Sequence, residues 1–386
     1  MEPLPYHRAV AATLEREHPS SFRALAARSR PGGPELDQSL LHSTYRLEPQ
    51  AHPLVHAALA RAGAALGVDV PLEAYAGEGG AAPNAELVFV PDRAIVVLSG
   101  PLLELLDADE LAAVAAHELA HHLLWTLEEG RFLAAARLLD AAEADARTPS
   151  EYLETARRYR LATELAADRS ALETTGSLVA TVGGLLKVAT GMRQVDPTAY
   201  LRQAAEVDLS TGSAGRTHPE TVLRAWALQR WSEEPGTADA LIGEVFAPSL
   251  DLDALDLAGQ DRLLTLTRDL VAAVLALDAD PVAEVLETAE QYGVGAPPAY
   301  PRTPESLLPR PLPPAQTRRY LASVLADLAT SDPDAGHDTL ARTLAFATAA
   351  GLGPDFAAML VADLGLTDAE RQRVTQRAGA LAAGGE

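Results

Sequence analysis

The sequence predicts an α+β protein that is mostly helical, with a small antiparallel sheet and, after it, an all-helical domain. Residues 112–124 are a run of Ala and Leu at helical spacing, with no Gly, Pro or β-branched cluster to interrupt it. Three strand-like runs precede this helix, at residues 70–77, 85–90 and 93–100. After about residue 235 the chain becomes helix rich in Leu and Asp, with few aromatic side chains. Together these features define the fold class.

The composition limits the classes of function. With 386 residues, of which 48% are hydrophobic, the chain can bury a large core and is long enough for two domains. A formal charge of −23 opposes binding to nucleic acid or to an anionic bilayer. The absence of cysteine excludes disulfides and thiolate metal sites. No apolar run reaches the ~20 residues that span a bilayer, and the N-terminus lacks a signal-peptide core, so we expect a cytoplasmic protein without a transmembrane segment.

Changes along the chain predict three parts. Residues 1–48 form an N-terminal helical extension, residues 49–234 carry the motifs described below, and residues 235–386 form a helical C-terminal domain. Within the last part, residues 295–314 contain eight prolines, which favour an extended, stiff connector. The alternatives are that this segment wraps the preceding domain, or that it is a polyproline ligand for a partner's aromatic groove.

The first chemical motif is an HExxH pattern on the predicted helix, whose start is marked by a capping box of Asp107 and Glu110. His117 and His121 share one face, so both imidazoles can point at a common atom. Zinc suits this geometry, with the adjacent Glu118 free to take a proton from water. The alternative is an Ala-rich helix whose His and Glu side chains lie on a solvated face.

A second helical stretch, residues 163–172, offers a candidate third ligand for the same ion. Glu164 and Asp168 are four residues apart, so one carboxylate can bind the metal while the other hydrogen-bonds a ligand histidine and fixes its tautomer. The alternative is a surface acidic pair near Arg169. The position of these residues some forty residues after HExxH favours the ligand interpretation.

Four other histidines are not expected to bind the metal. A helix is predicted for residues 6–29, and His7 on it is expected at the surface. His52 and His56 are four residues apart, but no third ligand follows them at a suitable spacing. His122 lies about 140° around its helix from the first motif histidine, so it is expected to face away from the metal.

The order of these motifs is similar to that of the M48 family of zinc metallopeptidases, which includes the CAAX prenyl proteases and HtpX-like proteases. The resemblance covers roughly residues 50 to 230. It rests on PNA at 83–85, a hairpin, AAHELAHH, ELAADR, and THPETVLRA at 217–225. It implies a zincin-type (gluzincin) domain. The chain departs from the better-known members, which have transmembrane helices, so their membrane substrates do not transfer to it.

The resemblance also implies roles for individual residues. His117, His121 and Glu164 correspond to the zinc ligands and Glu118 to the general base. These further residues match the family's motifs: Asn84 and Ala85 at the substrate cleft, His218 as a donor to the oxyanion, and Arg224 as a residue that holds this segment through an acidic neighbour. The alternatives are a turn after Pro83 for Asn84 and a helix cap for His218.

We therefore predict a zinc-dependent metalloendopeptidase, a hydrolase with one Zn²⁺ per chain that acts on a peptide or protein. The alternative is a non-catalytic protein that keeps zinc as a structural element and recruits a protein partner through its helical C-terminal domain. The presence of Glu118 argues against this alternative, because a structural zinc site has no use for that carboxylate.

Overall fold

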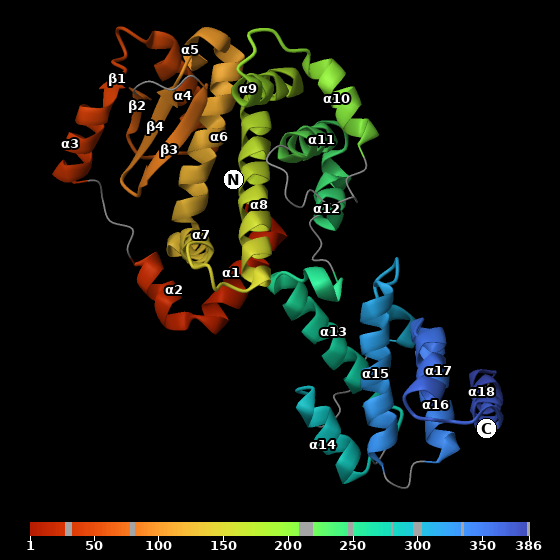
Figure 1. Ribbon diagram of the computed structural model, residues 1–386. Helices are drawn as coiled ribbons and strands as arrows, with labels where there is room; N and C mark the ends of the chain where they lie inside the picture. Colours follow the sequence, from red (N-terminus) through yellow and green to blue (C-terminus); the bar gives the residue numbers. More distant parts are fainter. Residues whose placement is uncertain are drawn as a thin grey trace. The chain divides into compact units, whose positions relative to one another are not determined.

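The computed structural model groups the chain into two compact units, Met1–Ala247 and Pro248–Glu386 (Figure 1). The residues that it describes are 1–27, 33–77, 82–207, 219–245, 250–278, 281–295, 303–332 and 336–383.

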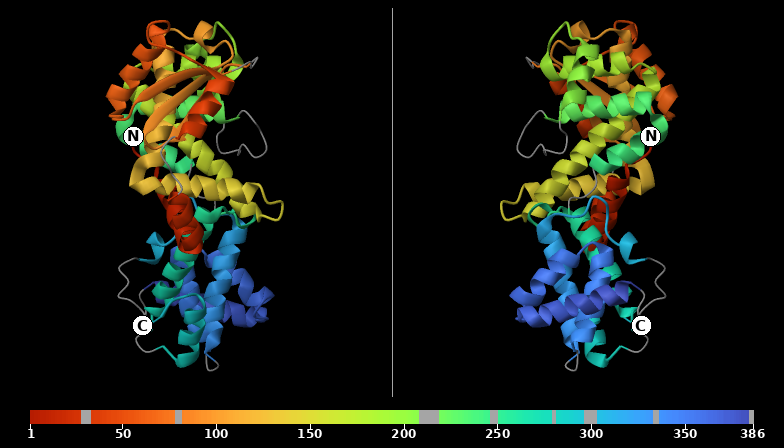
Figure 2. Two further views of the ribbon diagram at one scale, coloured as in Figure 1. Left: turned by 90° about the vertical axis from the view of Figure 1, so that its left-hand side faces the viewer. Right: turned by 90° about the vertical axis from the view of Figure 1, so that its right-hand side faces the viewer.

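The first unit contains a mixed sheet of four strands in the order β1-β2-β4-β3. Its strands are β1 (Thr44–Arg46), β2 (Leu72–Gly77), β3 (Asn84–Val90) and β4 (Arg93–Ser99). The predicted antiparallel sheet is therefore wrong in one pairing. Strands β3 and β4 form an antiparallel hairpin, but β2 lies parallel to β4 on its other side. The left view of Figure 2 looks onto these strands, drawn in orange.

The sequence of β4 explains its central position. Ala94, Val96 and Leu98 belong to one buried cluster, whereas Ile95 and Val97 belong to another. Both faces of the strand are thus apolar, as in a strand covered on both sides, and not alternately apolar and polar as on a sheet with one solvated face. Strand β3 lies at the edge of the sheet and is more exposed.

Helices pack around the long helix α6 (Ala108–Thr126), which contacts the sheet, α4 (Pro53–Leu66) and α8 (Ser150–Thr175). The sheet and α8 lie on opposite sides of α6 (Figure 1). The other helices of this unit are α1 (Pro5–Glu17), α2 (Pro19–Ala26), α3 (Pro34–Ser43), α5 (Leu102–Leu105), η1 (Leu127–Gly130), α7 (Arg131–Glu143), α9 (Leu178–Thr190), α10 (Pro197–Glu206), α11 (Pro219–Glu233) and α12 (Pro235–Val245).

The N-terminal segment is integrated into the first unit. The helix predicted for residues 6–29 is two helices, because Pro19 starts a new helix after His18, whose backbone is not helical. Helix α1 packs on both α7 and α8. At the other end of the unit, α12 packs on α11 and lies before the division at residues 247 and 248, although the sequence predicts the C-terminal domain from residue 235.

The described elements of the second unit are all helical. They are η2 (Leu252–Ala254), α13 (Leu257–Leu275), α14 (Ala283–Gln291), η3 (Pro304–Ser306), α15 (Ala315–Ser331), α16 (His337–Ala350), α17 (Gly353–Ala362) and α18 (Asp368–Ala382). The described part of the Pro-rich connector, from residue 303 on, packs into this unit: Leu307 and Leu308 are buried in the same core as Leu321 of α15. Across the described ranges, no helix is both long and apolar enough to cross a membrane.

Candidate metal centre

The predicted capping box fixes the start of α6. The Asp107 carboxylate accepts hydrogen bonds from the backbone N–H groups of Asp109 (3.0 Å) and Glu110 (2.9 Å), and the Glu110 carboxylate accepts one from Asp107 N–H (2.9 Å). Three backbone N–H groups at the start of the helix are thereby satisfied. The HExxH residues follow two turns later on an uninterrupted helix.

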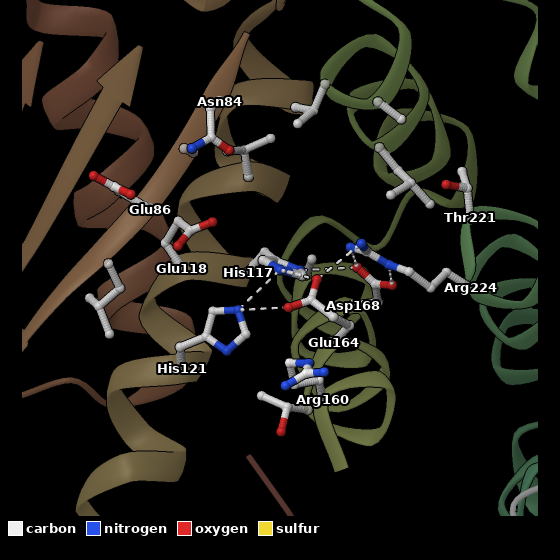
Figure 3. Close-up of a pocket in the computed structure, with 18 of the residues that line it drawn as sticks. Asn84, Glu86, His117, Glu118, His121, Arg160, Glu164, Asp168, Thr221 and Arg224 are labelled. Carbon is white, nitrogen blue, oxygen red and sulfur yellow. Dashed lines mark hydrogen bonds and ion pairs between the residues drawn. The ribbon is translucent and has the colours of Figure 1, made fainter. Parts of the chain in front are cut away.

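Three donor atoms converge between α6 and α8 (Figure 3). The Nε2 atoms of His117 and His121 are 3.2 Å apart. Glu164 Oε2 lies 3.3 Å from the first nitrogen, and Glu164 Oε1 lies 3.6 Å from the second. Ligand atoms held about 2.0 to 2.1 Å from a tetrahedral zinc ion lie roughly 3.3 to 3.4 Å from one another. The three side chains therefore fit such an ion closely.

Asp168 and Arg224 lie behind His117 (Figure 3). Asp168 Oδ1 accepts a hydrogen bond from His117 Nδ1 at 3.0 Å, and the carboxylate also accepts from Arg224 Nε (2.6 Å) and Nη2 (2.8 Å). Burial opposes the charge of Asp168, but Arg224 and then His117 hold the pKa of this carboxyl below its usual range. An ionised Asp168 accepts the Nδ1 proton, which leaves Nε2 of His117 free to bind a metal.

This geometry does not match the surface acidic pair considered from the sequence. The side chain of Asp168 is only 4% exposed. Arg224 Nη1 also lies 3.0 Å from Glu164 Oε2, so one guanidinium joins both carboxylates of the ExxxD pattern. Arg169 instead pairs with Glu173 and Asp239, away from the convergent donors.

The protonation of the donors reflects their closeness. Burial would lower the pKa of His117, but Glu164 and Asp168 more than offset this and raise it to about 10. Burial and the charge of His117 lower the pKa of His121 to about 4. Burial would raise the pKa of Glu164, but His117 and Arg224 lower it below its ordinary range. Without a metal, His117 is thus protonated, and this one proton takes the place that a metal cation would fill.

Glu118 lies next to the donors and is not one of them. It is 6% exposed, and burial raises its pKa to about 7. Its carboxylate receives a hydrogen bond from the backbone of Leu87 on β3. A carboxyl group whose pKa is near neutrality can both accept and return a proton at physiological pH.

A cleft of about 680 Å³ opens in front of the donors. Asn84, Ala85, Glu86 and Leu87 of the edge strand β3 form one rim, and Thr221 of α11 lies across from it (Figure 3). The Leu87 N–H points away from β4 and toward Glu118. Along an antiparallel strand, the backbone groups of successive residues point alternately toward and away from the paired strand, so those of Ala85, two residues earlier, point the same way as those of Leu87. The outer edge of β3 thus faces the cleft.

Two residues missed by the sequence analysis support the donor residues. The Trp125 ring is stacked beside the His121 ring, with centroids 6.4 Å apart and planes 16° apart. His7, expected at the surface, is fully buried; its Nε2 lies 3.1 Å from Oγ1 of Thr163, next to Glu164 in the chain, and burial lowers its pKa to about 3. The prediction for His7 was wrong because a local pattern does not show which helices α1 packs against.

The remaining histidines differ in their positions. His122 is buried and packs against the Phe89 ring of β3 at 5.5 Å, outside the group of convergent donors. His56 Nε2 bonds to Leu47 O at 2.5 Å, and the His52 ring contacts Tyr45. His218 lies outside the described residues.

Comparisons with known proteins agree with this arrangement. The model of peptidase family M48 matches residues 49–232. The plastoglobule-localized metallopeptidase 48, chloroplastic, of Arabidopsis thaliana is 31% identical over 199 residues, which are 46% of this chain and 56% of that protein. The chain thus spans little more than half the length of this curated relative. No solved structure gives a significant match. The motifs, the donor geometry and the two matches together show that the segment 49–232 belongs to peptidase family M48.

Proposed function

We propose that this protein is a zinc-dependent metalloendopeptidase in which Glu118 is the general base. The observation that carries the proposal is the convergence of His117, His121 and Glu164 at zinc-ligand spacing, with Glu118 beside them on a cleft. When bound, zinc would lower the pKa of a water molecule and polarise the carbonyl of the scissile peptide. We also propose that these three residues bind zinc, that the protein cleaves internal peptide bonds, and that the domain has the gluzincin fold.

The chain's own residues supply the remaining steps. The backbone groups on the outer edge of β3 at Ala85 bind the substrate as an added strand, with Asn84 at the end of this rim. Glu118 takes a proton from the attacking water as the C–O bond forms, and it delivers that proton to the amine nitrogen as the C–N bond breaks. Asp168, held by Arg224, keeps His117 in one tautomer and one orientation. The role of His218 as an oxyanion donor stays a prediction.

A structural zinc site is the second candidate function. It needs a closed ligand set, whereas the described donors here are three and face a cleft of about 680 Å³. It also assigns no role to a buried carboxyl group that accepts a hydrogen bond from the edge strand. Recruitment of a partner by the second unit and a cytoplasmic location remain predictions from the sequence.

Metal analysis and cleavage of a proteome-derived peptide mixture test the proposal together. We expect one zinc per chain, lost on substitution of His117, His121 or Glu164 by Ala. The Glu118→Gln variant should keep its zinc while the rate of cleavage falls by about 10² to 10⁴, because only the proton acceptor has been removed. Full zinc content in His117→Ala contradicts the site, and full cleavage by metallated Glu118→Gln contradicts the base.

A further inference from the structure

Helix α1 lies outside the segment that matches family M48, which begins at residue 49. It nevertheless packs on α7 and on α8, and α8 carries Glu164 (Figure 1). Three of its polar side chains, those of His7, Arg8 and Glu15, bond to α8 or to the junction of α6 and α7. We call these three the clamp residues.

His7 fixes α1 to the turn of α8 that carries Glu164. Its side chain is fully buried, and burial lowers its pKa to about 3, so the imidazole is neutral. Its Nδ1 accepts a hydrogen bond from Leu4 N–H at 3.1 Å, so the ring hydrogen is on Nε2, which donates to Thr163 Oγ1 at 3.1 Å. The Thr163 hydroxyl donates in turn to Tyr159 O at 2.9 Å. A directed chain of hydrogen bonds thus joins α1 to the residue before Glu164.

The turn that follows α6 has an unusual backbone. Glu128 (φ 48°, ψ 47°), Glu129 (φ 58°, ψ 33°) and Gly130 (φ 81°, ψ 18°) are all left-handed. This conformation is unfavourable for a residue with a Cβ atom, so it persists only where the surrounding structure holds it. Glu128 is seven residues after His121, so the turn determines where the metal helix ends.

The clamp residues help to hold this turn. The Glu128 carboxylate pairs with Arg8 of α1, and also with Arg131 of α7 at 3.2 Å. Arg131 pairs in turn with Glu15 of α1 at 3.0 Å. Arg8 and Glu15 are seven residues apart, so they lie on one face of α1, about two turns from each other. Among the described residues, no hydrogen bond or ion pair involves the side chain of Glu129.

The clamp residues therefore tie α1 both to the end of α6 and to α8. The two motif histidines lie on α6 and Glu164 lies on α8, so the spacing of the donor atoms depends on how these helices are held. We propose that α1 is a clamp that positions the metal donors, and that metal affinity depends on its polar contacts. The clamp residues are positioning residues, since they act through Thr163, Glu128 and Arg131. The inference rests on the proposed metal site.

The first test compares two substitutions in the turn after α6, in the full chain. Glu128→Gly and Glu129→Gly each remove a carboxylate and relieve one left-handed residue, since glycine adopts positive φ without a steric cost. Only Glu128→Gly breaks the pairs with Arg8 and Arg131. It should weaken zinc binding about fivefold in competition against a chelator, because an exposed ion pair contributes up to about that factor, whereas Glu129→Gly should leave the affinity unchanged. Equal zinc affinities of the two variants overturn the clamp.

The second test concerns the contact of His7 with α8. Leucine fills the buried volume without a donor, whereas a glutamine amide can place an N–H group near the position of Nε2. Zinc affinity should fall about fivefold in His7→Leu, because Thr163 loses its partner, and should recover to within about twofold of the wild type in His7→Gln. Thr163→Val, which keeps the volume of the side chain, replaces His7→Leu if that variant does not fold.

Thr343→Val is the matched control for the loss of a buried polar contact. Thr343 is buried on α16 of the second unit, and its hydroxyl donates to Thr339 O at 3.0 Å. This variant should lower the melting temperature without changing zinc affinity. Unchanged zinc affinity in His7→Leu, or no recovery in His7→Gln, overturns the positioning role of His7.

Hydrogen exchange of the metal-free protein separates failure of this inference from failure of the metal site. Relative to the wild type and Glu129→Gly, amide exchange should be faster in the last turn of α6 in Glu128→Gly, and in the turn of α8 that ends at Glu164 in His7→Leu. If the wild type binds no zinc, the proposed site fails, but these faster rates still support the clamp. Zinc binding by the wild type, with unchanged exchange and affinity in both variants, overturns the clamp and leaves the metal site intact.

Discussion

The two motif histidines occupy equivalent positions in the sequence but differ in their surroundings. His117 is hydrogen-bonded through Nδ1 to Asp168, which Arg224 holds in turn. His121 has the Trp125 ring at its side, and none of the hydrogen bonds between described residues involves its Nδ1. The two pKa values are displaced in opposite directions, to about 10 and about 4.

The difference shows two kinds of support around one candidate metal site. A carboxylate fixes both the tautomer and the direction of an imidazole, whereas a stacked aromatic ring fixes only its plane. Helix α8 explains the asymmetry, because it passes on the His117 side and carries both Glu164 and Asp168. We therefore expect the site to depend more on the support of His117 than on that of His121.

The largest effect is expected from Asp168→Ala. Loss of this carboxylate frees the His117 ring and leaves Arg224 without its main partner, so zinc affinity should fall about 10- to 100-fold. Competition against a chelator of known affinity measures this change. Asp239→Ala is the matched control, because Asp239 pairs with Arg169 outside the donor group and its removal should leave zinc affinity unchanged. Equal affinities of Asp168→Ala and the wild type would falsify the supporting role.

The pH dependence of zinc binding is the next test of the comparison. In the metal-free protein the pKa of His117 is raised to about 10, so at pH 8 this imidazole carries a proton that zinc must displace. Affinity should therefore rise with pH by about tenfold per unit below that pKa, and about one proton should be released per zinc at pH 8. His121, with its pKa lowered to about 4, should release none.

Calorimetry in buffers of different ionisation enthalpy counts the released protons. Asp168→Ala removes one of the two carboxylates that raise the pKa of His117, so this variant should release fewer protons than the wild type. Zinc binding that releases no proton at pH 8 contradicts the difference in protonation between the two histidines.

The sequence predicts the part of this site that local spacing determines. The capping box, the HExxH face and the ExxxD pair each depend on residues three or four apart on one helix, and that geometry follows from the helix itself. The contact of Asp168 with one of the two histidines was also anticipated. The sequence did not decide which histidine, because this depends on how α8 crosses α6.

The sequence does not predict which distant segments of the chain pair with each other. The parallel contact of β2 with β4 needs the two strands to meet across intervening chain, and the apolar run of β4 indicates burial but no partner. Likewise, His7 is 156 residues from Thr163, so their contact results from tertiary packing. Trp125 differs, because it is four residues after His121 on the same helix and its place beside that ring follows from local spacing.

The smallest effect is expected from Trp125→Leu. An aromatic pair contributes about 0.5 to 1.5 kcal/mol beyond burial, and only part of that orients His121, so zinc affinity should fall about threefold. The number of protons released should stay near one, because Asp168 still holds His117. Trp226→Leu is the matched control, since Trp226 is half-buried on α11 and does not line the cleft. The contrary result is that Trp125→Leu weakens zinc binding as much as Asp168→Ala does. The aromatic ring would then support His121 as firmly as the carboxylate supports His117, and the two halves of the site would be energetically equal despite their different surroundings.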